Sequence, residues 1–154
     1  MDGKVHNGLG MHSGSIEHMC INPDGPLCYC GERGCLETYC SADSLERAAG
    51  TDIPSFFAEL RLGNPAFSKI WKDYLRHLAF AVCSLNVVLD CYVIISGYLA
   101  PFFLPEDLEL LTQMITDISP FKQQKDFIFL SSHGQLAPPV GAALYYIDEF
   151  LHNM

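Results

Sequence analysis

Three cysteines fall within eight residues in the stretch Cys28-Tyr29-Cys30-Gly31-Glu32-Arg33-Gly34-Cys35-Leu36-Glu37. Two glycines lie between the second and third cysteines, and glycine lets the backbone turn tightly enough to aim three thiolates at one point. Structural zinc sites use four tetrahedral nitrogen or sulfur ligands. The spacing therefore predicts a zinc ion bound by all three cysteines, and it disfavours a redox role because C-x-C is an uncommon redox spacing.

The fourth zinc ligand is less tightly specified by spacing. His18 lies just before Pro23-Asp24-Gly25, a turn signal that lets the chain fold back toward the cysteines. Cys20 and Cys40 flank the cluster and are competing candidates. Few apolar residues occur between residues 18 and 36, so this segment is expected to be disordered without its metal.

Composition excludes several classes of protein. The chain has 154 residues, which suit one domain, and its net charge of -9 makes direct contact with nucleic-acid phosphates unfavourable. Met1–Lys4 is polar and not a signal peptide, and the longest apolar run is interrupted by polar residues. We therefore expect a cytoplasmic protein that contacts neither membrane nor nucleic acid. Seven cysteines, an odd number, argue against a disulfide framework.

Downstream of the cysteines, the hydrophobic pattern predicts an α/β architecture. Apolar residues recur at helical spacing over about six turns after Pro65, and two short β-type runs follow. A single domain, 1–154, is expected, with a zinc loop at 18–37 and a helical and α/β part at 38–154. The order helix–strand–helix–strand–helix in its second half implies a parallel strand pair covered by helices. The expected helices are 36–49, 54–62, 65–89, 105–118 and 140–151, and the expected strands are 4–6, 92–95 and 127–130.

Charged residues outside the cysteine stretch carry no comparable signal. Glu106, Asp107 and Glu109 stand near the start of the expected helix 105–118, where negative charge suits the helix dipole. We interpret them as solvated charges rather than ligands.

Three runs of sequence resemble the signature of the ROK family (repressors, open reading frames and sugar kinases). They are Ser13–Met19, Asn22–Gly25 and Cys28–Glu37, which match the pattern A-G-E-I-G-H-M, a spacer, and C-x-C-G-x-x-G-C-x-E. Asp90–Tyr98 and Gly141–Leu144 resemble two further family segments, so the likeness covers essentially the whole chain. The resemblance implies the C-terminal lobe of an actin-like, ribonuclease H-like ATPase fold.

The resemblance also assigns roles to individual residues. It implies that His18 is the fourth zinc ligand beside Cys28, Cys30 and Cys35, and that His18 also contacts a sugar hydroxyl. Glu37 corresponds to a second sugar contact. Gly97 corresponds to a turn that approaches the nucleotide in the family's kinases.

Three departures from the family pattern affect the sugar and nucleotide sites that the resemblance implies. The family's glutamate in E-x-G-H falls at Ser15, its glycine falls at Glu17, and the second glycine of the nucleotide turn falls at Tyr98. In an extended strand Glu17 would face the same side as Ser15, displaced by about 6–7 Å. A large side chain at residue 98 would crowd a nucleotide.

Two parent proteins are compatible with this resemblance. The D-x-G-x-T phosphate loop, the catalytic aspartate and the winged helix of family members are absent from the sequence. We therefore expect the sugar-effector-binding and oligomerisation part of a transcriptional regulator, because Ser15, Glu17 and Tyr98 weaken a kinase site. The alternative is the C-terminal half of a sugar kinase, inactive by itself. A third hypothesis is a free-standing zinc module with only an interaction role. Expected partners are a sugar and a second copy of the chain, bound through an exposed seam.

Overall fold

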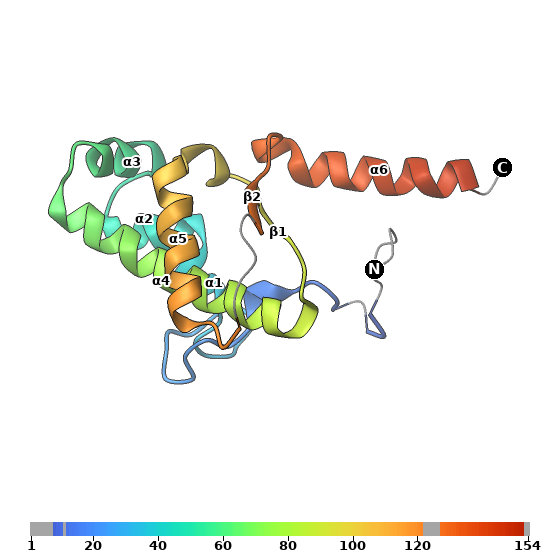
Figure 1. Cartoon of the computed structure of the whole chain (residues 1–154), viewed down its shortest axis with the longest axis horizontal. Helices are drawn as coiled ribbons and strands as arrows, with labels where there is room; N and C mark the ends of the chain where they lie inside the picture. Colours follow the sequence, from blue (N-terminus) through green and yellow to red (C-terminus); the bar gives the residue numbers. More distant parts are fainter. Residues whose placement is uncertain (1–7, 11, 122–126, 153–154) are drawn as a thin grey trace.

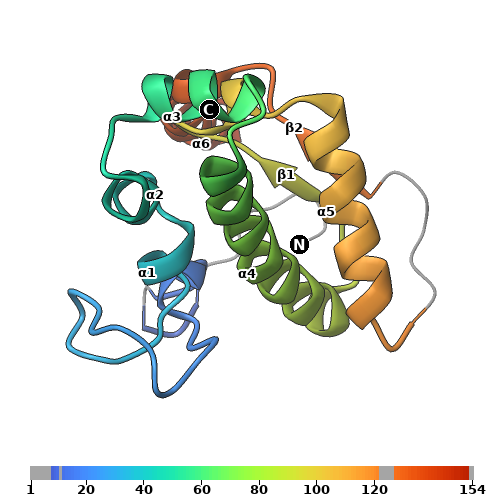
Figure 2. The ribbon, with the colours of Figure 1, turned by 90° about the vertical axis from the view of Figure 1, so that its left-hand side faces the viewer.

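The computed structural model describes residues 8–10, 12–121 and 127–152. The strand expected at 4–6 lies outside these residues. Three short helices follow the N-terminal loops: α1 (Glu37–Cys40), α2 (Ala42–Ala49) and α3 (Ile53–Arg61). They lie on one side of the long helix α4 (Pro65–Leu89) (Figures 1 and 2).

The helix expected at 36–49 is two helices. Ser41 adopts extended backbone angles (φ -87°, ψ 162°), and its side chain accepts a hydrogen bond from the backbone N–H of Ser44 at 3.1 Å. Serine is a favoured N-cap because its oxygen satisfies a backbone donor that has no partner inside the helix. The chain therefore stops one helix and starts another at this residue. Gly50 ends α2 in the left-handed conformation, as expected.

Helix α4 and its neighbour α5 (Pro105–Ile118) have the predicted bounds. Asn64 caps α4 by accepting from the N–H of Ala66, and Pro65 occupies the first helical turn. Helix α5 packs along α4 (Figure 2).

The two strands form a parallel pair, as the order of elements predicts. Strand β1 (Val93–Ile95) pairs with β2 (Ile128–Leu130), and Ile94 lies opposite Phe129. Helix α6 (Ala137–His152) begins before its expected start, with two prolines in its first turn, where their missing N–H groups cost no hydrogen bond.

Helix α6 extends away from the rest of the molecule (Figure 1). It carries large exposed apolar side chains: Leu144, Tyr146, Ile147, Phe150 and Leu151. An exposed apolar surface is therefore present, as the sequence analysis expects. Within the described parts of the chain, no helix combines the length and hydrophobicity that a membrane crossing requires.

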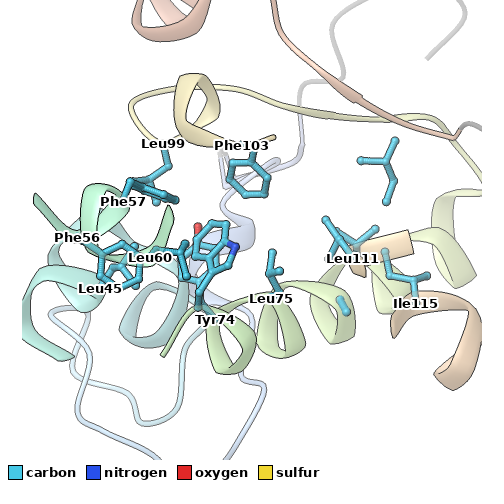
Figure 3. Packing of buried hydrophobic residues seen from close by; sticks show 14 of the residues in the cluster. Leu45, Phe56, Phe57, Leu60, Tyr74, Leu75, Leu99, Phe103, Leu111 and Ile115 are labelled. Carbon is cyan, nitrogen blue, oxygen red and sulfur yellow. The ribbon is translucent and has the colours of Figure 1, made fainter. Parts of the chain in front are cut away.

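The hydrophobic core joins the short helices to α4 and α5. Phe56, Ile53 and Leu75 are fully buried, and Leu111 and Ile115 contribute the face of α5 (Figure 3). Aromatic rings fill the space between α3 and α4. The Phe57 ring meets the Trp71 ring edge-on at 5.0 Å, and Trp71 stacks on Tyr74 at 4.9 Å. The aromatic residues of these helices thus form the core rather than a binding platform.

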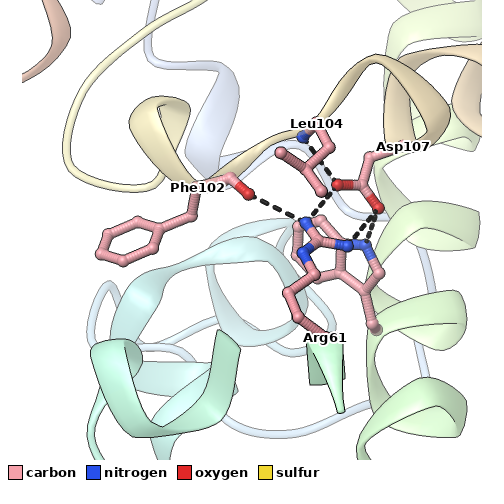
Figure 4. Close-up of polar contacts among 5 residues, drawn as sticks. Arg61, Phe102, Leu104 and Asp107 are labelled. Carbon is pink, nitrogen blue, oxygen red and sulfur yellow. Dashed lines mark hydrogen bonds and ion pairs between the residues drawn. The ribbon is translucent and has the colours of Figure 1, made fainter. Parts of the chain in front are cut away.

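Asp107 is buried, so the expectation that the acidic residues of α5 are all solvated charges is wrong at this position. Its carboxylate is 5% exposed and accepts hydrogen bonds from the guanidinium of Arg61, from the Trp71 indole N–H at 2.7 Å and from the Leu104 N–H at 2.8 Å (Figure 4). Arg61 also donates to the carbonyl of Phe102. One buried carboxylate therefore ties α3, α4 and the start of α5 together.

Candidate metal centre

Two antiparallel backbone contacts shape the cysteine-rich loop at residues 18–37. Cys20 pairs with Cys35, and Leu27 pairs with Arg33. The Leu36 N–H donates to the Met19 carbonyl at 2.9 Å, which brings the segment after His18 alongside the third cysteine. The loop therefore folds back as the Pro23-Asp24-Gly25 turn predicts, and it lies beneath α1 in Figure 1.

The loop gathers His18, Cys28, Cys30 and Cys35, whose potential ligand atoms all lie within 4.8 Å of one another. The Sγ atoms of Cys30 and Cys35 are 3.7 Å apart, and Cys28 Sγ lies 3.7 Å from His18 Nδ1. Tetrahedral zinc, with bonds of about 2.3 Å to sulfur and about 2.0 Å to nitrogen, places two sulfurs about 3.8 Å apart and sulfur and nitrogen about 3.5 Å apart. This cluster could bind a metal ion, and its donors and spacing fit zinc.

The two competing cysteines lie outside the cluster. Cys20 is exposed, and its thiol donates to the carbonyl of Arg33 at 3.4 Å. The Cys40 thiol donates to the Tyr74 carbonyl at 3.7 Å, and burial raises its pKa to about 12. His18 is therefore the fourth member of the cluster.

The three clustered thiols differ in their surroundings. Cys28 and Cys35 are buried, whereas Cys30 is exposed. Desolvation raises the pKa of Cys35 to about 12, with a further contribution from the neighbouring thiols. A hydrogen bond from the Glu32 backbone N–H lowers the pKa of Cys30. Deprotonating three neighbouring thiols would place several negative charges close together, one of them fully buried. A metal cation bound among them would compensate this charge.

The backbone of Asn22 packs directly against Gly34, more closely than the structure allows at any other glycine of the loop. It has φ +69°, and a Cβ atom there would lie 1.6 Å from the backbone oxygen of Asn22. Gly34→Ala is therefore expected to open the loop and to weaken zinc binding by at least roughly tenfold more than the positive φ alone would, since the clash involves rigid backbone. Competition with a chromophoric chelator measures the affinity. The matched control is Gly31→Ala, which has open space around the added carbon and pays only for its positive φ, about 1–2 kcal/mol. Equal affinities of the two variants would contradict the close packing at residue 34.

Polar and aromatic groups surround the exposed side of His18. The Tyr29 ring lies edge-on to the imidazole, with centroids 5.0 Å apart. Partial desolvation raises the pKa of Tyr29, and the negative charges of Glu17 and Glu37 raise it further. Glu37 is the first residue of α1. The spacing of C-x-C gave no sign that the residue between the cysteines would contact His18.

The segment before His18 is not an extended strand, the conformation in which Glu17 would face the same side as Ser15. Ile16–His18 is a 3₁₀ helix, with the Met19 N–H donating to the Ile16 carbonyl. The Glu17 carboxylate lies 3.8 Å from His18 Nε2, measured to Oε1. The displacement that Glu17 would have in an extended strand therefore does not apply, because the backbone turns here.

The expected nucleotide turn lies in a different part of the fold, after β1. Gly97 has φ +87° and donates its N–H to the carbonyl of Gly134 at 3.3 Å. Tyr98 is partly exposed and meets Phe102 edge-on. Gly97 thus lies in a turn, as predicted, and no described contact tests its role toward a nucleotide.

Comparison with known proteins identifies what this arrangement resembles. The model of the ROK family matches residues 1–149. An N-acetylmannosamine kinase of Vibrio cholerae serotype O1 is 30% identical over 102 residues, which cover 63% of this chain and 36% of that protein. The ROK hexokinase of Thermus thermophilus superposes with a TM-score of 0.82 at 25% identity, over 95% of this chain and 51% of that one.

A ROK family transcriptional regulator shares the fold with a TM-score of 0.61 at 18% identity, over 75% of this chain and 33% of that one. The chain thus spans about half or less of the length of the relatives it matches. The expected mixed α/β portion of an actin-like ATPase fold is confirmed. With its family model matched over nearly the whole sequence, the chain belongs to the ROK family.

Proposed function

We propose that this chain is the sugar-binding, zinc-containing part of a ROK sugar kinase. The observation that carries the proposal is the cluster of His18 with three cysteines, which leaves His18 Nε2 beside the carboxylate of Glu17. The N-acetylmannosamine kinase and the ROK hexokinase resemble this chain more closely than the transcriptional regulator does, which favours a kinase over a regulator.

Zinc in this proposal has a structural role. It is bound by His18, Cys28, Cys30 and Cys35, and it leaves no open position for substrate, as in other closed sites. Ligation through Nδ1 fixes the neutral imidazole with its hydrogen on Nε2. His18 then presents a fixed N–H donor to the solvent side of the loop.

The sugar is bound beside this donor. Glu37 accepts a hydrogen bond from one sugar hydroxyl, and His18 Nε2–H donates to another. A carboxylate acceptor forms shorter and stronger hydrogen bonds than a neutral one, which suits recognition of a polyol. Gly97 contributes to the nucleotide turn in the same proposal, with Tyr98 narrowing the space there.

Phosphoryl transfer requires parts that this sequence does not supply. The reaction depends on positioning and charge stabilisation by a phosphate loop and a catalytic base. We therefore propose that the chain alone binds a sugar without phosphorylating it. Phosphorylation of any hexose by this chain with ATP would contradict the proposal.

Sugar binding is tested with Glu37→Gln. The zinc-loaded chain is titrated with N-acetylmannosamine and with glucose, and binding is followed by chemical-shift changes. Loss of a charged hydrogen bond is expected to weaken binding about tenfold or more. The control is Glu32→Gln, which changes an exposed carboxylate of the same loop. Absence of binding to both sugars by the unaltered chain would refute the function.

The regulator remains the second candidate. It is favoured by Ser15 and Glu17, which replace the family's E-x-G-H residues, and by Tyr98 in the nucleotide turn. The coding sequence upstream of Met1 distinguishes the two. A winged helix there would support the regulator, and a D-x-G-x-T loop without one would support the kinase.

A further inference from the structure

Glu17 stands where the family pattern has glycine, and the structure brings its carboxylate to the open side of the metal cluster. The two ring nitrogens of His18 face different neighbours. Nδ1 lies 3.7 Å from Cys28 Sγ, whereas Nε2 lies 3.8 Å from Glu17 Oε1. The side chains of His18 and Glu17 are 30% and 39% exposed, so both reach solvent.

The distance between His18 Nε2 and Glu17 Oε1 suits a group that bridges the two side chains. A separation of 3.8 Å is too long for a direct hydrogen bond. One hydroxyl oxygen can nevertheless bridge the two groups. It would lie about 2.9 Å from the His18 nitrogen and about 2.7 Å from the Glu17 oxygen, and the angle at the hydroxyl oxygen would be roughly a right angle. A hydroxyl can accept from the imidazole and donate to the carboxylate at once. A small rotation of the Glu17 side chain opens the angle toward the tetrahedral value.

The Glu17 carboxylate also has unused capacity to accept hydrogen bonds. Among the described residues, its side chain contacts only His18 within ion-pair distance. Ser15, at the family's glutamate position, is exposed and forms no side-chain cap. The Tyr29 ring contacts the same imidazole, with centroids 5.0 Å apart.

We propose that Glu17 is a sugar-binding residue that, with His18 Nε2, holds one sugar hydroxyl, and that it replaces the carboxylate missing at Ser15. The inference rests on the proposed function, because it assigns a contact within the same sugar site. The Glu17 carboxylate lies two residues later in the sequence than the glutamate of the family pattern. The 3₁₀ turn of Ile16–His18 places it beside His18.

The experiment titrates the zinc-loaded chain with N-acetylmannosamine and glucose, following chemical shifts. Glu17→Ala is expected to weaken binding of the sugar about 10- to 100-fold, and Glu17→Gln less, since its amide oxygen still accepts. Glu32→Gln, in the same loop, is expected to bind as the unaltered chain does. All three variants are expected to retain one zinc per chain.

Monodeoxy analogues of the bound sugar identify the hydroxyl. One analogue is expected to lose affinity for the unaltered chain and to show no further loss with Glu17→Ala, because the same contact is already absent.

The outcomes separate the two proposals. Unchanged sugar binding by Glu17→Ala, with loss in Glu37→Gln, would overturn the role of Glu17 and leave the proposed function standing. Loss of zinc together with sugar in Glu17→Ala would also overturn it, since Glu17 would then act on the metal site. Failure of the unaltered chain to bind either sugar would overturn the proposed function and this inference with it.

Discussion

Cys35→Ser is expected to weaken zinc binding about a hundredfold or more, so that a competing chelator removes the metal and the segment from residue 18 to residue 36 becomes disordered. The Cys35 side chain is 1% exposed and its sulfur lies 3.7 Å from that of Cys30, so no other thiol of the cluster can take its place. Structural zinc sites contribute about 10–16 kcal/mol of apparent binding energy near neutral pH. Loss of one of four ligands is therefore expected to cost about 3 kcal/mol or more, a hundredfold or more in affinity.

Elemental analysis and amide NMR spectra measure this result. After dialysis against a chelator of intermediate affinity, the unaltered chain is expected to carry about one zinc ion, and Cys35→Ser close to none. Signals of the loop should collapse, while those of α2–α5 persist because these helices have their own core. Cys20→Ser is the matched control, since Cys20 pairs with Cys35 through the backbone but its thiol lies outside the cluster. Full zinc occupancy in Cys35→Ser would refute the assignment of the metal centre.

Asp107→Ala is expected to destabilise the helical domain by about 3–5 kcal/mol. The substitution leaves the Arg61 guanidinium, the Trp71 indole N–H and the Leu104 N–H without their shared acceptor. Removing one partner of a buried ion pair costs more than the pair contributes, because the remaining charge has lost its water as well as its partner. Because the Arg61 side chain is one-third exposed and water can solvate it, the loss of stability is expected near the lower end of this range.

Denaturant unfolding followed by circular dichroism measures the change in the free energy of unfolding. Asp73→Asn is the matched control, because Asp73 forms an exposed ion pair with Arg76 one helical turn along α4. Such pairs contribute about 0–1 kcal/mol. If both variants unfold at the same denaturant concentration, Asp107 does not tie the helices together.

The parts of the fold that depend on neighbouring residues could be predicted from the sequence. The bounds of α4 and α5 follow from apolar spacing and from proline in the first turn. The parallel pairing of β1 and β2 follows from the intervening helix. The break at Ser41 was missed because helix periodicity continues across it, and only the cap geometry shows that the chain turns.

Features that depend on contacts between residues far apart in the sequence could not be predicted. Asp107 lies 36 positions after Trp71 and 46 after Arg61, so no local pattern indicates that its charge is buried. The choice of His18 over Cys20 likewise depends on the pairing of Cys20 with Cys35, which turns the Cys20 thiol toward the Arg33 carbonyl. The position of Glu17 depends on a 3₁₀ turn that no residue pattern in this segment indicates. The spacing of the cysteines thus predicted that these three residues cluster, and backbone geometry decided which other groups meet them.

The position of Trp71 has a practical consequence for experiments on this protein. It is the single tryptophan of the chain, it is 3% exposed, and its indole donates to Asp107 while stacking on Tyr74. Its fluorescence therefore reports on the helical core alone. Zinc removal should leave its emission maximum in place, whereas global unfolding should shift the maximum to longer wavelength. One emission spectrum can thus distinguish a chain that has lost its metal loop from a chain that has lost its fold.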